Sequence, residues 1–357
     1  MRVANDAKAS LPQMNTKPLT TQAMKSFMPL RIAGVFVNLF SKVGQRPSPY
    51  ESKKEHVRLI SIAVSNYVEK VRWGLDLLEA NPKSPIYYTE DLHAPALASL
   101  QTVPASKDQA SQSPMAILKD GKAIWDSSAI IRALCSDPQT VNLYPEEIAD
   151  DIQKLEVDLA NRLGATARCF GYFCLFDNSK QYYKVASKFL TLHCPTVEQT
   201  AFDKMLPTGL AKGMKQLMKV DEFGEASEQE IRQVFQEMSQ RLDTNGGEYL
   251  MNTPSKNYGF TAADLSFCSL CYFIIRPPEM GPFLVPESEF PPKLLHLGKE
   301  LRETTAGKHV LKMYQKHRPV DSQKGVIVLK KVDQNRIPWL EVAGTVSVLG
   351  AVIYGFM

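Results

Sequence analysis

Three short polar motifs in the first half of the chain place hydroxyl and carboxyl groups where they could bind an anion or a peptide. They are Ser65, the pair Ser113-Pro114 and the pair Asp126-Ser127. The first turn of a helix exposes N–H donors and carries a partial positive charge, so it favours anions, thiolates included. Ser65 stands directly before the helical pattern of 66–80, and its hydroxyl would donate a hydrogen bond to a thiolate bound there. The alternative is that Ser65 only caps the helix.

The other two motifs suggest contacts with a peptide-like ligand. If the Ser113-Pro114 bond is cis, the backbone before it turns outward and offers its N–H and C=O groups to a ligand's peptide group. Asp126 and Ser127 stand at the start of another predicted helix. Ser127 would bind a ligand carboxylate at that helix N-terminus, and Asp126 would pair with an ammonium. Here too, helix capping is the alternative.

The six cysteines do not indicate a redox or metal centre. Six in 357 residues are too few for a secreted disulfide framework, so we expect a reducing compartment. Cys268 and Cys271 have the spacing of a redox pair, but they lie inside the apolar run 265–275. Redox pairs usually stand at a helix N-terminus, where the dipole lowers the thiol pKa. The sequence therefore predicts two buried, inert thiols and, because no second pair has zinc spacing, no metal site.

Apolar periodicity predicts the elements that must position these motifs. Residues 56–63 have the pattern of a buried strand, and apolar residues repeat at helical spacing in 66–80. Asn66 and Glu69 resemble a capping box at the start of that helix. A second strand at 86–91, a hairpin of 115–118 with 123–125 and a short helix at 127–134 follow. The order is β-α-β, then a β-hairpin, then a helix.

The rest of the soluble body has helical periodicity up to about residue 318. The candidate helices cover 148–175, 203–219, 227–243, 262–275, 291–303 and 306–317. Residues 176–202 and 244–259 are expected to be connections. The chain therefore divides near 138–147 into a small α/β domain, 56–137, and a larger all-helical domain, 145–318.

Charge and composition limit the classes of partner. The chain has 42 basic and 38 acidic side chains, and its net charge of +4 is too small to indicate nucleic-acid binding. Nothing matches a glycine-rich phosphate loop, so no nucleotide site is predicted. Residues 1–50 hold seven of the basic residues and one acid, a net +6, which leaves −2 on the remaining chain. This extension is consistent with an organelle-targeting segment, a basic helix on a membrane surface or a disordered tail.

The C-terminal segment 337–357 is apolar. Its 21 residues include one charge, and a helix of that length spans about 31 Å, close to the hydrocarbon thickness of a bilayer. Lys330, Lys331 and Arg336 precede it, which favours a cytosolic N-terminal flank. We expect a membrane anchor joined to the body by the linker 319–336. The alternative is an apolar helix or strand packed on the core.

Taken together, the ordered motifs resemble the glutathione transferase family, in which an all-helical domain follows a thioredoxin-like one. The resemblance covers 57–318 and rests on 65–73 (SNYVEKVRW), 113–114, 120–121, 126–130 (DSSAI), 260–266 (FTAADLS), 276–281 (RPPEMG) and 305–310 (TAGKHV). The last two segments are similar to those of bacterial-type members. The resemblance implies an α/β thioredoxin-like N-terminal domain, an all-α helical-bundle C-terminal domain and terminal extensions.

The resemblance also implies a role for each motif. Ser65 falls where the family places the residue that activates the glutathione thiol. Pro114 falls at the family's cis-proline, so Ser113 would contact the cysteinyl backbone of glutathione. Asp126 and Ser127 match the pair that holds the γ-glutamyl group.

Some positions depart from the family's pattern. Asn66 stands where many members have proline, and the stretch 100–112 is long and polar ahead of Pro114. Position 65 is serine and not cysteine, which argues against glutathione-dependent thiol-disulfide exchange. Residues 176–226 are expanded relative to compact members.

Three aromatic residues have weaker assignments. Tyr67 is a second candidate for the hydroxyl donor to the thiol. Tyr172 and Phe173 are candidates for a hydrophobic-substrate pocket between the domains. The alternative for both is the core, where an aromatic run on a helix is usually found.

The functional hypothesis is a glutathione transferase. Glutathione, as co-substrate, would bind the α/β domain as its thiolate and attack a hydrophobic electrophile held by the helical domain. A membrane anchor suits substrates that partition into lipid. The soluble body would face the cytosol on a mitochondrion, the endoplasmic reticulum or a plastid, and the family implies a homodimer. The alternative is a non-catalytic, membrane-anchored interaction protein on the same scaffold, because a fold does not imply a function.

Overall fold

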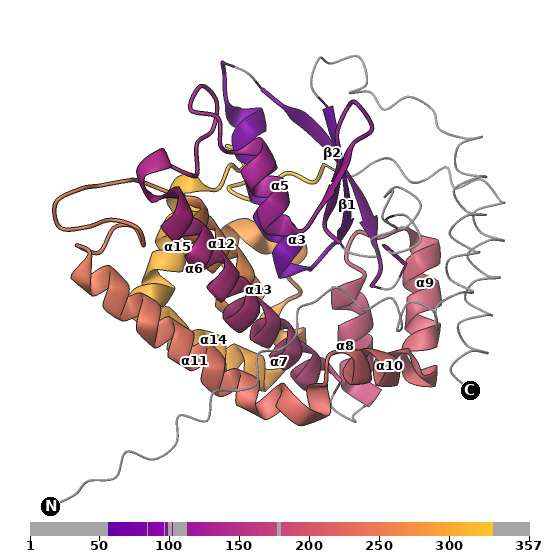
Figure 1. Cartoon of the computed structure of the whole chain (residues 1–357). Helices are drawn as coiled ribbons and strands as arrows, with labels where there is room; N and C mark the ends of the chain where they lie inside the picture. Colours follow the sequence, from indigo (N-terminus) through magenta and orange to yellow (C-terminus); the bar gives the residue numbers. More distant parts are fainter. Residues whose placement is uncertain are drawn as a thin grey trace, which may run out of the picture.

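The computed structural model describes residues 56–83, 85–95, 97–98, 102, 113–176 and 180–330 (Figure 1). The extension 1–50, the segment 337–357 and most of the stretch 100–112 lie outside these residues, so what was expected of them stays a prediction. None of the described helices is long and apolar enough to cross a membrane. The described part has the predicted fold class, a small α/β domain followed by an all-helical one.

The α/β domain is built on a four-stranded mixed sheet with the order β2-β1-β3-β4. Its elements are β1 (His56–Ile62), α3 (Asn66–Ala80), β2 (Tyr87–His93), β3 (Met115–Ile117), β4 (Ala123–Trp125) and α5 (Ser127–Leu134). β1 pairs in parallel with β2 and antiparallel with β3, and β3 pairs antiparallel with β4. The predicted β-α-β unit and hairpin are confirmed, and both helices have the predicted bounds.

The helix α3 lies between the sheet and the helical domain, and this position explains its composition. The predicted apolar stripe is buried, at no more than 1% exposure for Val68, Val71, Leu75 and Leu78. The rest of the helix buries charged side chains as well, namely Glu69, Lys70, Arg72 and Asp76. Because an unpaired buried charge is costly, each of these groups needs a partner of opposite charge.

Buried ion pairs supply those partners. Arg72 donates hydrogen bonds to Glu69 at 2.8 Å and to Glu90 of β2 at 2.6 Å. Arg318, at the end of the helical domain, donates to Glu69 at 2.9 Å and to Asp76 at 2.6 Å. We call these five residues the α3 charge cluster. It joins α3, the sheet and the end of the helical domain.

The capping box predicted at the start of α3 is wrong. Ser65 is the N-cap residue and Asn66 is the first residue of the helix. The Glu69 carboxylate belongs to the α3 charge cluster and accepts hydrogen bonds there. The Asn66 amide donates to the carbonyl oxygens of Gly164, at 3.1 Å, and Leu270, at 3.0 Å. Contacts with the second domain therefore replace the local capping pattern.

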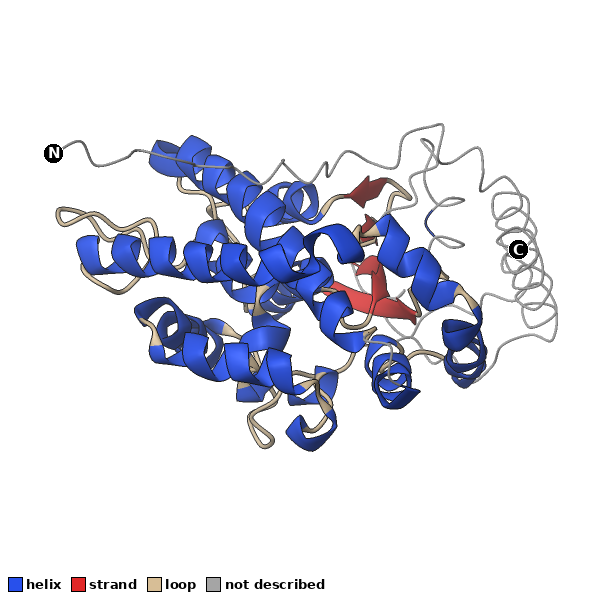
Figure 2. Ribbon diagram, turned by 90° about the horizontal axis from the view of Figure 1, so that it is seen from below, coloured by secondary structure: helices blue, strands red, loops and turns tan. Residues whose placement is uncertain are grey.

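Helices surround the small group of strands in Figure 2, and most of them belong to the helical domain. Its α-helices are α6 (Ala149–Leu159), α7 (Ala165–Leu175), α8 (Lys180–Leu190), α9 (Thr196–Met205), α10 (Leu210–Leu217), α11 (Val220–Thr244), α12 (Ala262–Leu270), α13 (Tyr272–Ile275), α14 (Pro292–Glu303) and α15 (Thr305–His317). A π-helical segment, Ala160–Gly164, joins α6 to α7. The helix predicted at 148–175 is thus nearly continuous, with one local change of winding.

The segment 176–202 differs most from expectation, because it is not a connection. It contains α8 and the beginning of α9, and α9 reaches the sheet where Glu198 meets His93 of β2 (Figure 1). The apolar stripe of α8 is narrow, and its buried members include Ala186, Phe189 and Leu190. Lys, Tyr and Ser fill most of the remaining positions, so α8 is a clearly amphipathic helix whose periodicity was overlooked.

Residues 319–330, expected to be part of a linker, pack against the rest of the protein. The Glu90 N–H donates to the Lys330 carbonyl oxygen at 2.7 Å, and the Lys330 ammonium lies 2.9 Å from the Glu79 carboxylate. Ile327 is 2% exposed, and its N–H donates to the Glu279 carbonyl at 3.0 Å. β2 is the outermost strand on its side of the sheet. This segment therefore covers part of the outer backbone of β2, which no other strand of the described sheet pairs with.

Candidate functional site

The sheet register brings the three predicted motifs to one edge of the sheet. Ile60 of β1 lies opposite Met115 of β3, and Met115 lies opposite Trp125 of β4. The carboxyl end of β1, the start of β3 and the carboxyl end of β4 therefore meet at the same edge. Ser65 follows the first of these ends, Ser113-Pro114 precede the second, and Asp126-Ser127 follow the third.

Ser65 is the N-cap residue of α3, but its hydroxyl does not cap the helix. Its backbone N–H donates to the Ile62 carbonyl at 3.0 Å, and its carbonyl accepts from the Glu69 N–H at 3.0 Å. Within the described residues, its side chain makes no capping hydrogen bond. The side chain is partly exposed at the N-terminus of a 15-residue helix. A free hydroxyl beside a positive helix end is the arrangement that a bound thiolate requires.

The Ser113-Pro114 peptide bond is cis, as predicted. The Ser113 hydroxyl donates a hydrogen bond to the Ile60 carbonyl oxygen at 3.4 Å, which ties the beginning of β3 to β1. Pro114 is buried and Ser113 is partly exposed. The backbone of Ser113 thus lies at the edge of the sheet, next to the chain that leads into Ser65.

Asp126 combines a cap with an unusual backbone. Its φ of 73° lies in the left-handed region, which a residue with a side chain rarely adopts. Its Oδ1 accepts a hydrogen bond from the Ala129 N–H at 2.9 Å, so the capping alternative is confirmed for this residue. The side chain is nevertheless exposed, and that bond does not use Oδ2. Backbone strain of this kind concentrates at functional sites.

Ser127 and Ser128 begin α5, and a buried cation, the Lys70 ammonium, binds Ser128. Ser127 is 3% exposed. The Ser128 hydroxyl accepts a hydrogen bond from the Lys70 ammonium at 2.7 Å, and Lys70 also lies 2.7 Å from Glu156 of α6. This pair fixes the start of α5 against α3 and the helical domain.

Tyr67 does not have a free hydroxyl. It donates to the Ala160 carbonyl oxygen at 2.8 Å, and burial raises the pKa of the phenol. The contact lies at the π-helical segment, where Gly164 allows the close approach: a Cβ on Gly164 would lie 2.6 Å from the Tyr67 oxygen. Tyr67 therefore joins the two domains in this structure, and Ser65 is the better-placed hydroxyl for a thiolate.

Tyr172 and Phe173, both candidates for a substrate pocket, lie in different surroundings. Phe173 packs against α11, where a Cβ added to Gly224 would lie 2.3 Å from its ring. Tyr172 is partly exposed and stacks on Phe176 with ring centroids 5.2 Å apart. Phe173 is partly exposed as well, and both rings also pack against Cys169, Val220 and Phe223, so the two stay candidates for a substrate pocket.

Sequence reasoning missed Arg168 of α7. Its guanidinium lies 5.6 Å from the centroid of the Tyr67 ring, next to the start of α3. Its Nε atom is buried without a hydrogen-bond partner. A lone arginine within a helix carries no sequence signal, because only the tertiary structure brings Arg168 next to Tyr67, about a hundred positions away along the chain.

A second missed feature is the pair of His93 and Glu198. The His93 Nδ1 lies 2.8 Å from one Glu198 oxygen, and the Ala94 N–H donates to the other at 2.8 Å. Burial lowers the pKa of His93, but the Glu198 carboxylate outweighs this and the net shift is upward. His93 ends β2 opposite Ile62, so the pair fastens α9 to the same sheet edge.

The protein's own thiols do not supply the chemistry. All six cysteines lie in the described part of the chain, where each is buried and none forms a disulfide. Burial raises the pKa of the Cys135 thiol to about 12 and that of Cys268 and Cys271 as well. The prediction that Cys268 and Cys271 are buried is confirmed. No cluster of metal-ligating side chains occurs among the described residues.

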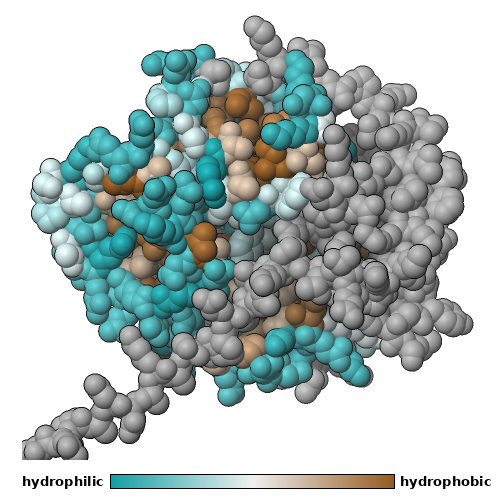
Figure 3. All heavy atoms as spheres, viewed as in Figure 1, coloured by the Kyte–Doolittle hydropathy of each residue, from teal (hydrophilic) through white to brown (hydrophobic). Residues whose placement is uncertain are grey.

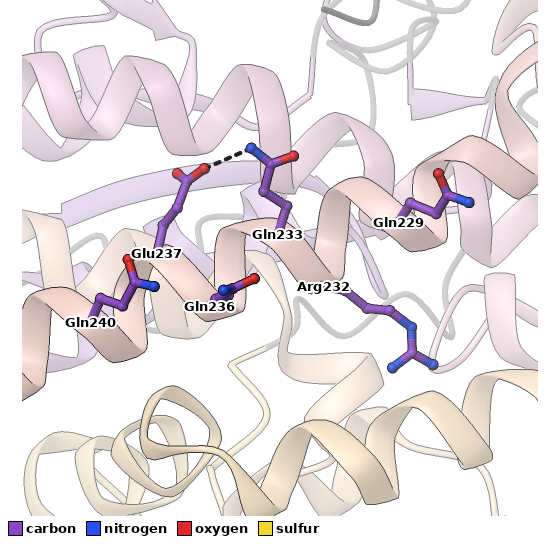
Figure 4. Close-up of a pocket in the computed structure, with 6 residues that line it drawn as sticks. All are labelled: Gln229, Arg232, Gln233, Gln236, Glu237 and Gln240. Atoms are coloured by element: carbon purple, nitrogen blue, oxygen red, sulfur yellow. Dashed lines mark hydrogen bonds between the residues drawn. The ribbon is translucent and has the colours of Figure 1, made fainter. Parts of the chain in front are cut away.

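A surface hollow of about 520 Å³ lies elsewhere, on one face of α11 (Figure 4). Its lining residues are Gln229, Arg232, Gln233, Gln236, Glu237 and Gln240. None of them belongs to the sheet-edge motifs. On the face shown in Figure 3, hydrophilic side chains cover most of the coloured helical surface and hydrophobic patches are scattered. The hollow fits a solvated helix face better than a reaction site.

Comparisons with known proteins match the architecture. No family model and no curated protein matches the sequence. Glutathione transferase GSTFuA3 from Phanerochaete chrysosporium is 16% identical, with 75% of this chain and 99% of that chain covered and a TM-score of 0.47. CsGST63524 of Ceriporiopsis subvermispora, solved with glutathione, is 15% identical, with 74% and 99% covered and a TM-score of 0.46.

Proposed function

We propose that the protein binds glutathione at the sheet edge formed by β1, β3 and β4 and conjugates it to hydrophobic electrophiles. One observation carries the proposal: the strand register gathers Ser65, Ser113-Pro114 and Asp126-Ser127 at a single edge. The Ser65 hydroxyl there makes no capping hydrogen bond to a described residue, and it faces the positive end of α3.

Each group has a distinct role in the proposed reaction. The Ser65 hydroxyl and the first N–H groups of α3 donate to the glutathione sulfur and stabilise its thiolate. Asp126 pairs with the γ-glutamyl ammonium, Ser127 donates to the γ-glutamyl carboxylate, and the Ser113 backbone pairs with the cysteinyl peptide group. The thiolate then attacks the electrophilic carbon, where a C–S bond forms. A leaving group departs, or the carbon skeleton takes up a proton. Catalysis comes from thiolate formation and proximity.

Titration calorimetry of glutathione into the full chain, kept in detergent micelles, tests this proposal. Loss of binding in Ser127→Ala is expected, and Ser288→Ala is a matched control because Ser288 is exposed and remote from the edge motifs. Ser65→Ala should bind glutathione but conjugate it about tenfold to a hundredfold more slowly, the value of a hydrogen bond to a charged group. A folded wild-type chain that does not bind millimolar glutathione would sink the proposal.

We further propose that 337–357 attaches the protein to a membrane with the body facing the cytosol. The support is the sequence itself, 21 residues with a single charge after a basic flank. The test is flotation of the full chain with lipid vesicles, compared with a chain that ends at residue 336. Equal flotation of both chains would remove this part of the proposal.

A further inference from the structure

One face of α7 is turned toward the start of α3. Arg168 and Tyr172 are four residues apart, so they lie on one side of α7, and Gly164, the last residue of the π-helical segment, precedes Arg168 at the same spacing. Gly164 approaches the Tyr67 hydroxyl, and Arg168 lies against the Tyr67 ring. Tyr172 is close enough to Arg168 that the guanidinium opposes the upward shift that burial gives the phenol's pKa. These groups therefore lie where the start of α3 meets the helical domain, and Tyr67 is two residues along the chain from Ser65.

Arg168 differs from the other interior arginines because its charge has no partner within the described residues. Arg72 and Arg318 each bind two carboxylates. Arg168 makes no ion pair or hydrogen bond with a described residue, its Nε is buried, and the rest of its side chain is partly exposed. A cation that is partly removed from water without a counter-charge costs free energy, and an anionic ligand would remove that cost.

Two groups of opposite charge act on Tyr67, and Arg168 is the one that lies over its ring, 5.6 Å from the centroid. Burial is the main cause of its raised pKa, while Arg168 lowers that pKa and Asp126 raises it. Asp126 belongs to the α/β domain, where it would pair with the glutathione ammonium. Arg168 belongs to the helical domain, on the side from which the second substrate would approach. The two charges are therefore suited to different ligands.

We propose that Arg168 binds a carboxylate of the second substrate, so that the protein prefers apolar or aromatic electrophiles that carry an acid group. The apolar part of such a molecule would lie on Tyr172 and the Tyr67 ring. This inference rests on the proposed glutathione conjugation and adds its substrate class. The guanidinium suits a carboxylate because its planar donors bind both oxygens at once.

A suitable reaction is the addition of glutathione to ethacrynate, an aryloxyacetate with an α,β-unsaturated ketone. The thiolate forms a C–S bond to the terminal alkene carbon, and the alkene electrons move onto the ketone as an enolate. A proton from water then converts the enolate to the ketone. The carboxylate is unchanged, so it reports on binding alone. The methyl ester of ethacrynate undergoes the same addition without the charge.

The test compares kcat/KM for the acid and its ester in the full chain. Arg168→Gln should lower the acid-to-ester ratio about tenfold to a hundredfold, as expected for a lost charge-assisted hydrogen bond, with little change for the ester. Arg168→Lys should recover part of the ratio. Arg232→Gln is the matched control, since Arg232 is 40% exposed on α11 and is paired with Glu228 and Glu300. An unchanged ratio in Arg168→Gln would overturn the proposal.

Two further measurements decide whether the carboxylate that Arg168 binds belongs to glutathione or to the second substrate. If Arg168→Gln weakens glutathione binding and leaves the acid-to-ester ratio unchanged, the carboxylate belongs to glutathione and the inference fails. The second measurement is calorimetric binding of dihydroethacrynate, which lacks the reactive alkene. Suppose that the chain does not bind glutathione but binds dihydroethacrynate, and that Arg168→Gln abolishes this binding. The site for the acid would then be supported, and the proposed glutathione conjugation would be contradicted. Circular dichroism of each variant checks that it is folded.

Discussion

The middle and the N-terminus of α3 treat their polar groups in opposite ways. In its middle, the α3 charge cluster pairs every charged group with one or more partners, all buried. At its N-terminus, the Ser65 hydroxyl does not cap the helix, and the neighbouring Arg168 lacks a counter-charge among the described residues. Paired groups hold the domains together, whereas unpaired groups at a surface edge are available to a ligand.

This difference predicts how substitutions should divide between stability and binding. Changes in the cluster leave an uncompensated buried charge and should act on folding. Substitutions at the sheet edge remove groups that have few partners in the protein, so they should weaken ligand binding and leave stability nearly unchanged. Four experiments, from the largest expected effect on stability to the smallest, test this division.

The largest effect is expected for Arg318→Ala. The substitution leaves Glu69 and Asp76 short of a buried partner, so the free energy of unfolding should fall by about 3–5 kcal/mol. Urea unfolding followed by circular dichroism measures it, with Arg132→Ala, an exposed arginine of α5, as control. A loss below about 1 kcal/mol, the value of a surface pair, would mean that the cluster does not join the domains.

Gly164→Ala should have the next largest effect. The new Cβ would lie 2.6 Å from the Tyr67 oxygen, so the domains must separate slightly, at a cost of about 1–3 kcal/mol. Gly281→Ala is the control, because its Cβ would meet only Val326 at 3.5 Å. Thermal unfolding should also show that Tyr67→Phe relieves part of the Gly164→Ala loss. Additive effects of the two substitutions would contradict the close contact.

The pair of His93 and Glu198 should make stability depend on pH. The folded pKa of His93 is raised, so the folded state binds the proton more tightly than the unfolded state. The resulting stabilisation is fully present below the unfolded value of about 6.5 and is lost as the pH rises through the higher folded pKa. Glu198→Gln should therefore destabilise the protein more at pH 6 than at pH 8. Equal losses at both pH values would exclude this linkage.

The smallest effect on stability is expected at the sheet edge. Ser65→Ala removes a side chain that makes no capping bond, so the free energy of unfolding should change by about 0.5 kcal/mol or less. The same variant should lose conjugation activity, which sets it apart from the cluster variants. Thermal unfolding and glutathione conjugation measured on one preparation compare the two effects. A large fall in the free energy of unfolding would mean that Ser65 stabilises the fold and would contradict this division.

Much of the α/β domain was predictable because its signals are local. The bounds of α3 and α5 follow from apolar spacing and from the residues at their starts, and the hairpin follows from its turn. The segment containing α8 was missed although it is amphipathic, because its many polar residues were taken for a connection. The capping box at Asn66 was wrong because Asn66 and Glu69 have stronger partners in the second domain.

The sequence by itself determined the two-domain order, the strand and helix pattern and the three motifs that could bind glutathione. Only the tertiary structure decided that these motifs share one sheet edge, that Tyr67 has no free hydroxyl, and that Arg168 and the pair of His93 and Glu198 lie beside them. The physical reason is distance along the chain. Periodicity and turn chemistry act over a few residues, whereas the contacts of Tyr67 with Ala160 and of His93 with Glu198 join residues about a hundred positions apart.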